Sequence, residues 1–173
     1  RDYNYGLHCG SLFGEVRNIL GVTGASYLFA EDDALFTEII DTRAELSYQA
    51  VKAVLESGAQ FDFAHFWEDI CFKSGPIVTL DFFNQVVVPR YQRIGDKLHQ
   101  HGIDLWYTDC DGDGRPLLPG FLKAGINCLF PFEVNSCCHP GELLDQYQGQ
   151  LRIMGGVDKM ALGKGPPAIK RSE

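Results

Sequence analysis

The chain has 173 residues, of which 45% are hydrophobic and 22% are charged, and its formal net charge is −8. This apolar content is enough for one domain with a core of its own, so we treat residues 1–173 as a single domain. The acidic balance argues against nucleic-acid binding, because an acidic chain gains nothing from the attraction of phosphates. The longest apolar runs fall far short of the roughly 20 residues of a membrane span. No signal peptide opens the chain, and its six cysteines are irregularly spaced, so we expect a cytoplasmic protein with reduced thiols.

Five short apolar runs predict buried strands, because each ends at Gly, Asp or Glu rather than at a hairpin signal. They cover residues 5–10, 61–67, 103–109, 127–133 and 151–157. The spacing of apolar residues predicts helices between them, over residues 33–57, 82–98, 117–124 and 141–147. Pro89 lies inside the second of these helices, so we expect a kink or a break there. Residues 168–173 have the pattern of a further helix that begins at the end of the chain.

Alternating strands and helices predict parallel strands that are joined by crossover helices. The last three strands begin about 24 residues apart, which leaves room for one strand, one helix and two loops each time. A closed (β/α)8 barrel has eight strands and typically about 250 residues, whereas only five strands are predicted. The expected fold class is therefore α/β, as a partial TIM (β/α)8 barrel. A doubly wound sheet and a barrel completed by self-association are the alternatives.

Acidic side chains follow the ends of successive predicted strands. Glu68 and Asp69 follow the second strand, and Asp109 and Asp111 follow the third. The carboxyl ends of parallel strands meet at one rim, so we expect Glu68, Asp69 and Asp109 to be catalytic. Carboxylates that converge in this way need a metal ion, a bound proton or a cationic ligand to offset their repulsion.

Each of these signals has a structural alternative. The run from Asp109 to Gly114 matches the first positions of an EF-hand calcium loop, but Gly120 stands at the twelfth position, where a bidentate Glu is required. A glycine-rich turn with solvated acids is therefore the structural alternative to an active-site loop. Acids at positions 68 and 69 are also typical of a helix N-terminus, where they favour the helix dipole. Residues 135–140 contain two adjacent cysteines and a histidine, a spacing that favours a loop over a metal site.

Several ordered blocks resemble the uroporphyrinogen decarboxylase family. The blocks are the Trp-Glu-Asp and Lys-Ser-Gly-Pro run in residues 65–76, the Pro-Arg-Tyr helix at 89–91, the loop 109–112, the Gly-Gly-Val-Asp-Lys run in 151–159 and the glycine-rich segment 10–21. The resemblance implies a (β/α)8 barrel with one of two activities. One branch decarboxylates uroporphyrinogen in porphyrin biosynthesis without a cofactor. The other transfers methyl groups between small methylated donors, corrinoid proteins and thiol or folate acceptors, often with zinc.

Details of the resemblance favour the methyltransferase-like branch. Decarboxylases of the family tend to have Asp-Ser-Trp-Ala-Gly where this chain has residues 66–70. The thiol-methylating members carry a His-x-Cys-Gly zinc motif, and the aligned positions here are Asp109 and Asp111. The resemblance thus implies a metal site, with zinc as the expected ion, formed by Asp109, Asp111 and Glu68.

The resemblance also implies the remaining partners of the chain. The candidate substrate-binding residues are Trp67, Lys73, Glu133 and Asp158. The partners that it implies are a small methylated compound and a corrinoid protein. A second copy of the chain is also expected, because five strands leave two sheet edges unpaired. We expect the chain to correspond to the C-terminal portion of the barrel and to lack part of the active site. A uroporphyrinogen decarboxylase is the first alternative, and a non-catalytic half-barrel that self-associates is the second.

Overall fold

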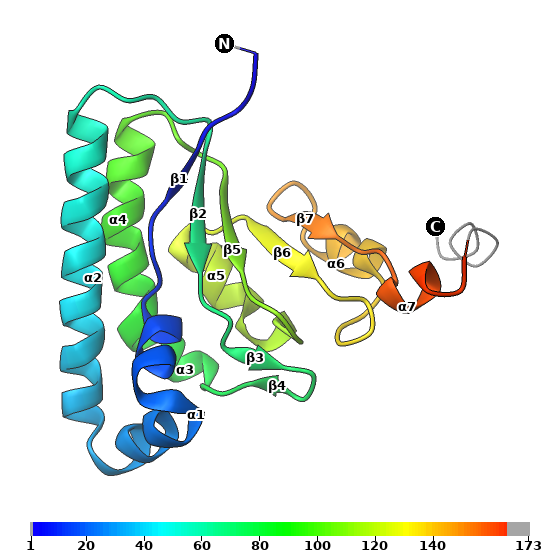
Figure 1. The fold of residues 1–173 in the computed structure, drawn as a ribbon, viewed down its shortest axis with the longest axis horizontal. Coiled ribbons are helices and arrows are strands. Elements are labelled where there is room, and N and C mark those ends of the chain that lie inside the picture. The colour runs from blue at the N-terminus through cyan, green and yellow to red at the C-terminus, as the bar shows by residue number, and fades with distance from the viewer. Residues whose placement is uncertain (1, 166–173) are drawn as a thin grey trace.

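Five parallel strands form one sheet in the computed structural model of the protein, which describes residues 2–165. The strands are β1 (Gly6–His8), β2 (Phe63–Trp67), β5 (Trp106–Asp109), β6 (Cys128–Phe132) and β7 (Arg152–Gly155). They lie in the order β1-β2-β5-β6-β7, and every neighbouring pair is parallel. Within the described residues the sheet does not close on itself (Figure 1). The α/β class and the partial-barrel arrangement predicted from the sequence are therefore confirmed.

The predicted helices are present with small shifts at their ends. They are α2 (Asp33–Glu56), α4 (Val88–Gln100), α5 (Leu118–Ala124) and α6 (Pro140–Gln146). The short α7 (Lys159–Leu162) that follows was not predicted. The side chain of Asp32 caps α2 by accepting a hydrogen bond from the Leu35 amide at 2.9 Å, which satisfies one of the free N–H groups of the first turn. Gly125, with a φ of 97°, closes α5. The helix expected over residues 168–173 lies outside the described part of the chain.

Pro89 has the effect that the sequence predicts. The helix that precedes it begins as α3 (Leu80–Phe82), passes through a π-helical turn η1 (Phe83–Val87), and becomes regular only as α4 begins. Because proline has no N–H and its ring clashes with the preceding turn, the usual spacing of hydrogen bonds is interrupted directly before it. The Thr79 side chain caps α3 by accepting from the Phe82 amide at 3.2 Å.

Two other elements were not predicted from the sequence. The first is α1 (Phe13–Glu31), in which Gly21 has a non-helical φ of 70° and interrupts the helix. The second is the hairpin of β3 (Cys71–Phe72) and β4 (Gly75–Pro76). A further single turn, η2 (Arg115–Leu117), leads into α5. Figure 1 shows α1 and the hairpin at the end of the sheet toward which the strand arrows point.

The helices α2 and α4 lie side by side along one face of the sheet (Figure 1). On this face the Phe66 ring meets the Tyr91 ring edge-on, with their centroids 4.9 Å apart. Gly95 allows α4 to approach closely, because a Cβ there would lie 2.3 Å from the Trp106 ring. The core between the sheet and these helices fixes the strand ends, and therefore the side chains that follow them. None of the helices in residues 2–165 combines the length and the apolarity that crossing a lipid bilayer would require.

The opposite face of the sheet is only partly covered within the described residues. It carries an aromatic row in which the Tyr107 ring contacts Phe63, His65 and Phe130, at centroid distances of 5.8, 4.4 and 5.7 Å. His8 and Phe130 on this face are exposed. In a closed barrel this would be the inner face, because the helices form the outer ring.

Candidate functional site

Three of the predicted acids converge at the carboxyl end of the sheet. We call this region, formed by the residues that follow β2, β5, β6 and β7, the mouth. Partial burial raises the pKa of Asp109, and the nearby carboxylates of Asp111 and Asp69 raise it further. The pKa of Asp111 is raised in turn by partial burial, by Glu133 and by Asp69. Mutual effects of this kind need short distances between carboxylates, so the structure brings Asp69, Asp109 and Asp111 together as the sequence predicts.

Glu68 does not join them, which corrects the expectation that its carboxylate lines the mouth. Its side chain is 0% exposed and lies on the helix-covered side of the sheet. The carboxylate accepts hydrogen bonds from the Leu12 and Gly14 amides, both at 2.8 Å, and from the Tyr91 hydroxyl. Burial raises its pKa, although the Tyr91 hydroxyl and the backbone N–H groups oppose the rise. Glu68 thus joins β2, the start of α1 and α4, and we assign it a structural role.

Asp69 has an unusual backbone conformation, with a φ of 47°. It is the one non-glycine residue with positive φ among residues 2–165, and such conformations are strained and often occur at functional sites. Its carboxylate pairs with the Arg17 guanidinium at 3.0 Å. The same guanidinium lies 5.4 Å from the centre of the Trp67 ring, a cation–π distance. Arg17 therefore holds Asp69 and Trp67 together at the mouth.

Glu133 and Lys159 join the far side of the mouth. The Lys159 ammonium donates to Glu133 Oε1, while Glu133 Oε2 accepts from the Gly112 amide at 3.0 Å. Lys159 and the Gly112 amide both lower the pKa of Glu133, and Glu133 raises the pKa of Lys159. Asp158 instead caps α7 and accepts from the Asn135 side chain at 2.7 Å. The loops after β5, β6 and β7 are thereby tied to one another.

Gly112 is required by the packing of the loop after β5. Its φ is 85°, and a Cβ at this position would lie 2.7 Å from the backbone of Phe72. The neighbouring Asp113 amide donates to the Phe72 carbonyl at 2.9 Å. The hairpin therefore fixes the loop that presents Asp109 and Asp111. Lys73 stands exposed at the tip of this hairpin and lines the mouth.

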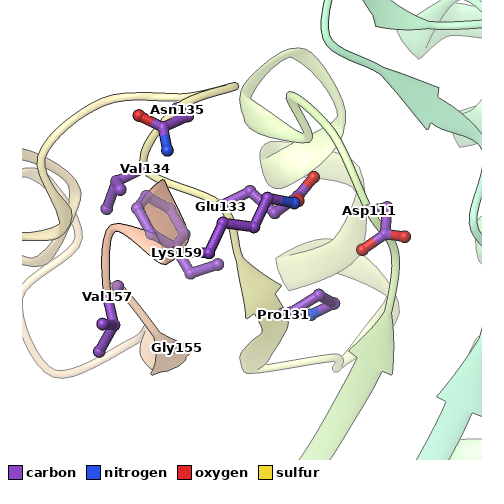
Figure 2. A pocket seen from close by; sticks show the side chains of 10 residues that line it. Asp111, Pro131, Glu133, Val134, Asn135, Gly155, Val157 and Lys159 are labelled. Atoms are coloured by element: carbon purple, nitrogen blue, oxygen red, sulfur yellow. The ribbon is translucent and has the colours of Figure 1, made fainter. Parts of the chain in front are cut away.

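Two adjoining cavities open at the mouth. The first, of about 290 Å³, has an apolar wall of Pro131, Phe132, Val134 and Val157 and carries Asp111, Glu133, Asn135 and Lys159 (Figure 2). The second, of about 360 Å³, is lined by charged side chains, namely Arg17, Asp69, Lys73, Asp111, Glu133 and Lys159. Asp111 and Glu133 belong to both. Figure 2 shows Asp111 on the opposite side of the first cavity from Val157.

The charges of the mouth are only partly balanced. Arg17 pairs with Asp69, and Lys159 pairs with Glu133. The carboxylates of Asp109 and Asp111 have no ion pair with any residue between 2 and 165. Burial is the main cause of the raised pKa of both carboxylates, and neighbouring carboxylates raise both further, although Lys159 opposes the rise at Asp111. The mouth is therefore suited to a ligand that brings a positive charge.

The carboxylate set expected to bind zinc does not fit a zinc site. The three expected ligands would have to be directed at one point, and Glu68 is instead directed into the core. Across the described residues, no group of three or more His, Cys, Asp or Glu side chains is placed to hold a metal ion. We therefore derive no step of a reaction through a metal at Asp109 and Asp111.

One residue of the mouth was missed by the sequence interpretation. Arg17 lies in α1, whose helical pattern Gly21 obscures. The position of Lys159 shortly after the fifth strand was a usable signal, but its pairing with Glu133 was not predicted. Tyr91, which binds Glu68, occurs in the Pro-Arg-Tyr block, but only its contact with Glu68 shows what it does.

Comparison with known proteins gives one match. The family model described as uroporphyrinogen decarboxylase (URO-D) matches residues 18–172, which is most of the chain. Searches among curated proteins and among solved structures find no match.

Proposed function

The chain belongs to the uroporphyrinogen decarboxylase family, and within that family we propose that it is a methyltransferase that acts with a corrinoid protein on a small, cationic methylated compound. The family membership supports both branches equally, so the choice between them depends on the mouth.

The observation that carries the proposal is the pair of carboxylates without a cationic partner. Asp111 lies close enough to Asp109 to raise the pKa of Asp109, Glu133 and Asp69 raise that of Asp111, and neither carboxylate has an ion pair with a described cation. A methylated ammonium group would supply the missing positive charge. Its methyl groups would lie against Pro131 and Phe132 in the first cavity, since an apolar wall stabilises groups that bind water poorly.

The size of the first cavity also favours a small compound. Its volume of about 290 Å³ lies at the lower limit of the roughly 300–1,000 Å³ that is typical of small-molecule sites. Uroporphyrinogen is a four-ring macrocycle with many carboxylates. Carboxylates at Asp109 and Asp111 would repel it. Of the three cations that line the mouth, Arg17 pairs with Asp69 and Lys159 pairs with Glu133, which leaves Lys73.

The residues of the mouth have separate roles in this proposal. Asp109 and Asp111 bind the positive charge of the donor and orient its methyl group. The Glu133–Lys159 pair holds the Gly112 loop and so keeps the carboxylates in place. Arg17 keeps Asp69 at the rim. The corrinoid of the partner protein would accept the methyl group, and the open side of the mouth is the direction from which that partner would approach.

A corrinoid methylation assay tests the proposal. The protein is mixed with a reduced corrinoid protein and a panel of methylated amines, and formation of methylated corrinoid is followed by its absorbance. We expect turnover with at least one amine, a loss of at least tenfold in Asp109→Asn, and no change in Asp145→Asn. Asp145 is an exposed acid on α6, outside the mouth. Inactivity of the folded protein across the panel, together with turnover of uroporphyrinogen in an anaerobic assay, would instead favour decarboxylation.

A further inference from the structure

Two histidine side chains face each other on the partly covered face of the sheet. His8 of β1 and His65 of β2 are direct partners in the parallel register. Their Nδ1 atoms are 3.2 Å apart, and their ring centroids are 4.9 Å apart. His8 is exposed and His65 is half-buried, so the space in front of the two rings is open to solvent on one side.

The distance between the two nitrogens matches the separation of two ligands on one metal ion. Imidazole nitrogens bind zinc at about 2.0–2.1 Å. Two such bonds whose nitrogens are 3.2 Å apart enclose an angle of about 100–106° at the metal, which is close to the tetrahedral value that zinc adopts in proteins.

The surroundings hold His65 in this orientation. Its ring stacks on the Tyr107 ring at 4.4 Å with an interplanar angle of 18°. Its carbonyl accepts a hydrogen bond from the Cys9 amide at 2.8 Å, which fixes β1 against β2. Ligands held by regular strands and by ring stacking lose little freedom when a metal binds.

We propose that His8 and His65 form a binding site for one divalent transition-metal ion, held by their two Nδ1 atoms. The site lies on the same face as Trp67 but two residues before it along β2, about 6.6 Å away at the usual rise of a strand. The remaining coordination positions would be filled by water or an added ligand, because His8 is exposed to solvent. This site is separate from the mouth, and it does not depend on the proposed methyl transfer.

Zinc titration with a competing chromophoric chelator tests the proposal. We use a background in which Cys137 and Cys138 are serine, because these half-buried thiols could bind zinc themselves. We expect one equivalent of zinc to bind, with affinity at least tenfold weaker in His8→Gln and in His65→Gln. His99→Gln is the matched control, because His99 is an exposed histidine on α4 that pairs with Asp104. Equal affinity in all four proteins would overturn the proposal.

Nitrogen NMR of the histidine side chains, in the same background with serine at positions 137 and 138, supplies a second readout that needs no histidine variant. Zinc should shift the Nδ1 resonances of two histidines and leave the other three unchanged. If the two rings only share a proton, the Nδ1 resonances will respond to pH but not to zinc, and the proposal fails. Circular dichroism confirms folding in each variant, and His8→Gln, which alters an exposed side chain, remains informative if His65→Gln does not fold.

Discussion

Replacing Glu68 by alanine should destabilise the fold rather than act on the mouth. The carboxylate is fully buried and accepts three hydrogen bonds, from two backbone amides and the Tyr91 hydroxyl. Its removal leaves three buried donors without an acceptor, and each unsatisfied donor costs about 1–3 kcal/mol. Partial access of water to the resulting cavity would relieve part of this cost, so we expect a loss of about 3–5 kcal/mol.

Such a loss is large relative to the roughly 5–15 kcal/mol by which domains are stable. Equilibrium unfolding in urea, followed by circular dichroism, measures it directly. Tyr91→Phe removes one of the three hydrogen bonds and should cost about 1 kcal/mol. Glu38→Ala is the control, because Glu38 is exposed on α2 and its replacement should change stability by less than about 0.5 kcal/mol.

The result that refutes this reasoning is a loss of less than about 1 kcal/mol in Glu68→Ala. The carboxylate would then be solvated instead of bonded to the start of α1, and its original assignment to the mouth would be open again. A second contradiction would be equal losses in Glu38→Ala and Glu68→Ala, since burial would then make no difference.

Three further predictions concern the mouth and the sheet. The pKa of Asp109 is raised above 3.8, so the stability that the protonated carboxyl contributes is fully present below pH 3.8 and is lost as pH rises through the folded-state pKa. Asp109→Asn should therefore gain stability relative to wild type as the pH is raised from 3.5 to 7, measured by urea unfolding. A difference in stability that stays constant with pH would contradict the assignment. Asp69 has a φ of 47°, which asparagine tolerates and a β-branched residue does not. The free energy of unfolding of Asp69→Val should therefore be about 1–2 kcal/mol lower than that of Asp69→Asn. Equal unfolding midpoints in urea would argue against strain. The partly covered sheet face and its unpaired edges predict self-association, which sedimentation equilibrium checks; a folded monomer at all concentrations would refute it.

The strand ends were predictable because they depend on local pattern. Apolar runs that stop at an acid or a glycine placed Asp109 correctly at the end of its strand, and Glu133 and Asp158 after theirs. The parallel arrangement followed from the alternation with helices, and it brought Asp69, Asp109 and Asp111 to one rim. The end of α5 at Gly125 was also predictable, because helices commonly end at a glycine in the left-handed conformation.

The position of Glu68 was not predicted, although strand alternation contains the necessary signal. Successive residues of a strand face opposite sides of the sheet, so Phe66 and Glu68 share one face while Trp67 shares the other with its register partner Asp109. Reading adjacent acids as one cluster overlooked this rule. The partner of Glu68 could not be found from the sequence at all, because Tyr91 and the start of α1 are distant along the chain.

Arg17 and the hairpin show a second reason for incomplete prediction. The apolar periodicity of α1 is weak and Gly21 breaks it, so the helix that carries Arg17 was read only as a glycine-rich segment. The hairpin of β3 and β4 has two residues in each strand, which is too short for any periodic pattern. Both elements depend on tertiary contacts, namely those of Glu68 with α1 and of Gly112 with Phe72.

Binding of a simple methylated cation tests the central claim most directly, because it requires neither a corrinoid partner nor turnover. Tetramethylammonium is titrated into the protein at pH 7 while backbone amide resonances are recorded. The account predicts saturable shifts at Asp109, Asp111 and Gly112 that disappear when both aspartates are changed to asparagine and persist in Asp145→Asn. Shifts that are unaffected by the two substitutions, or a mouth that binds a polycarboxylate and ignores the cation, would contradict it.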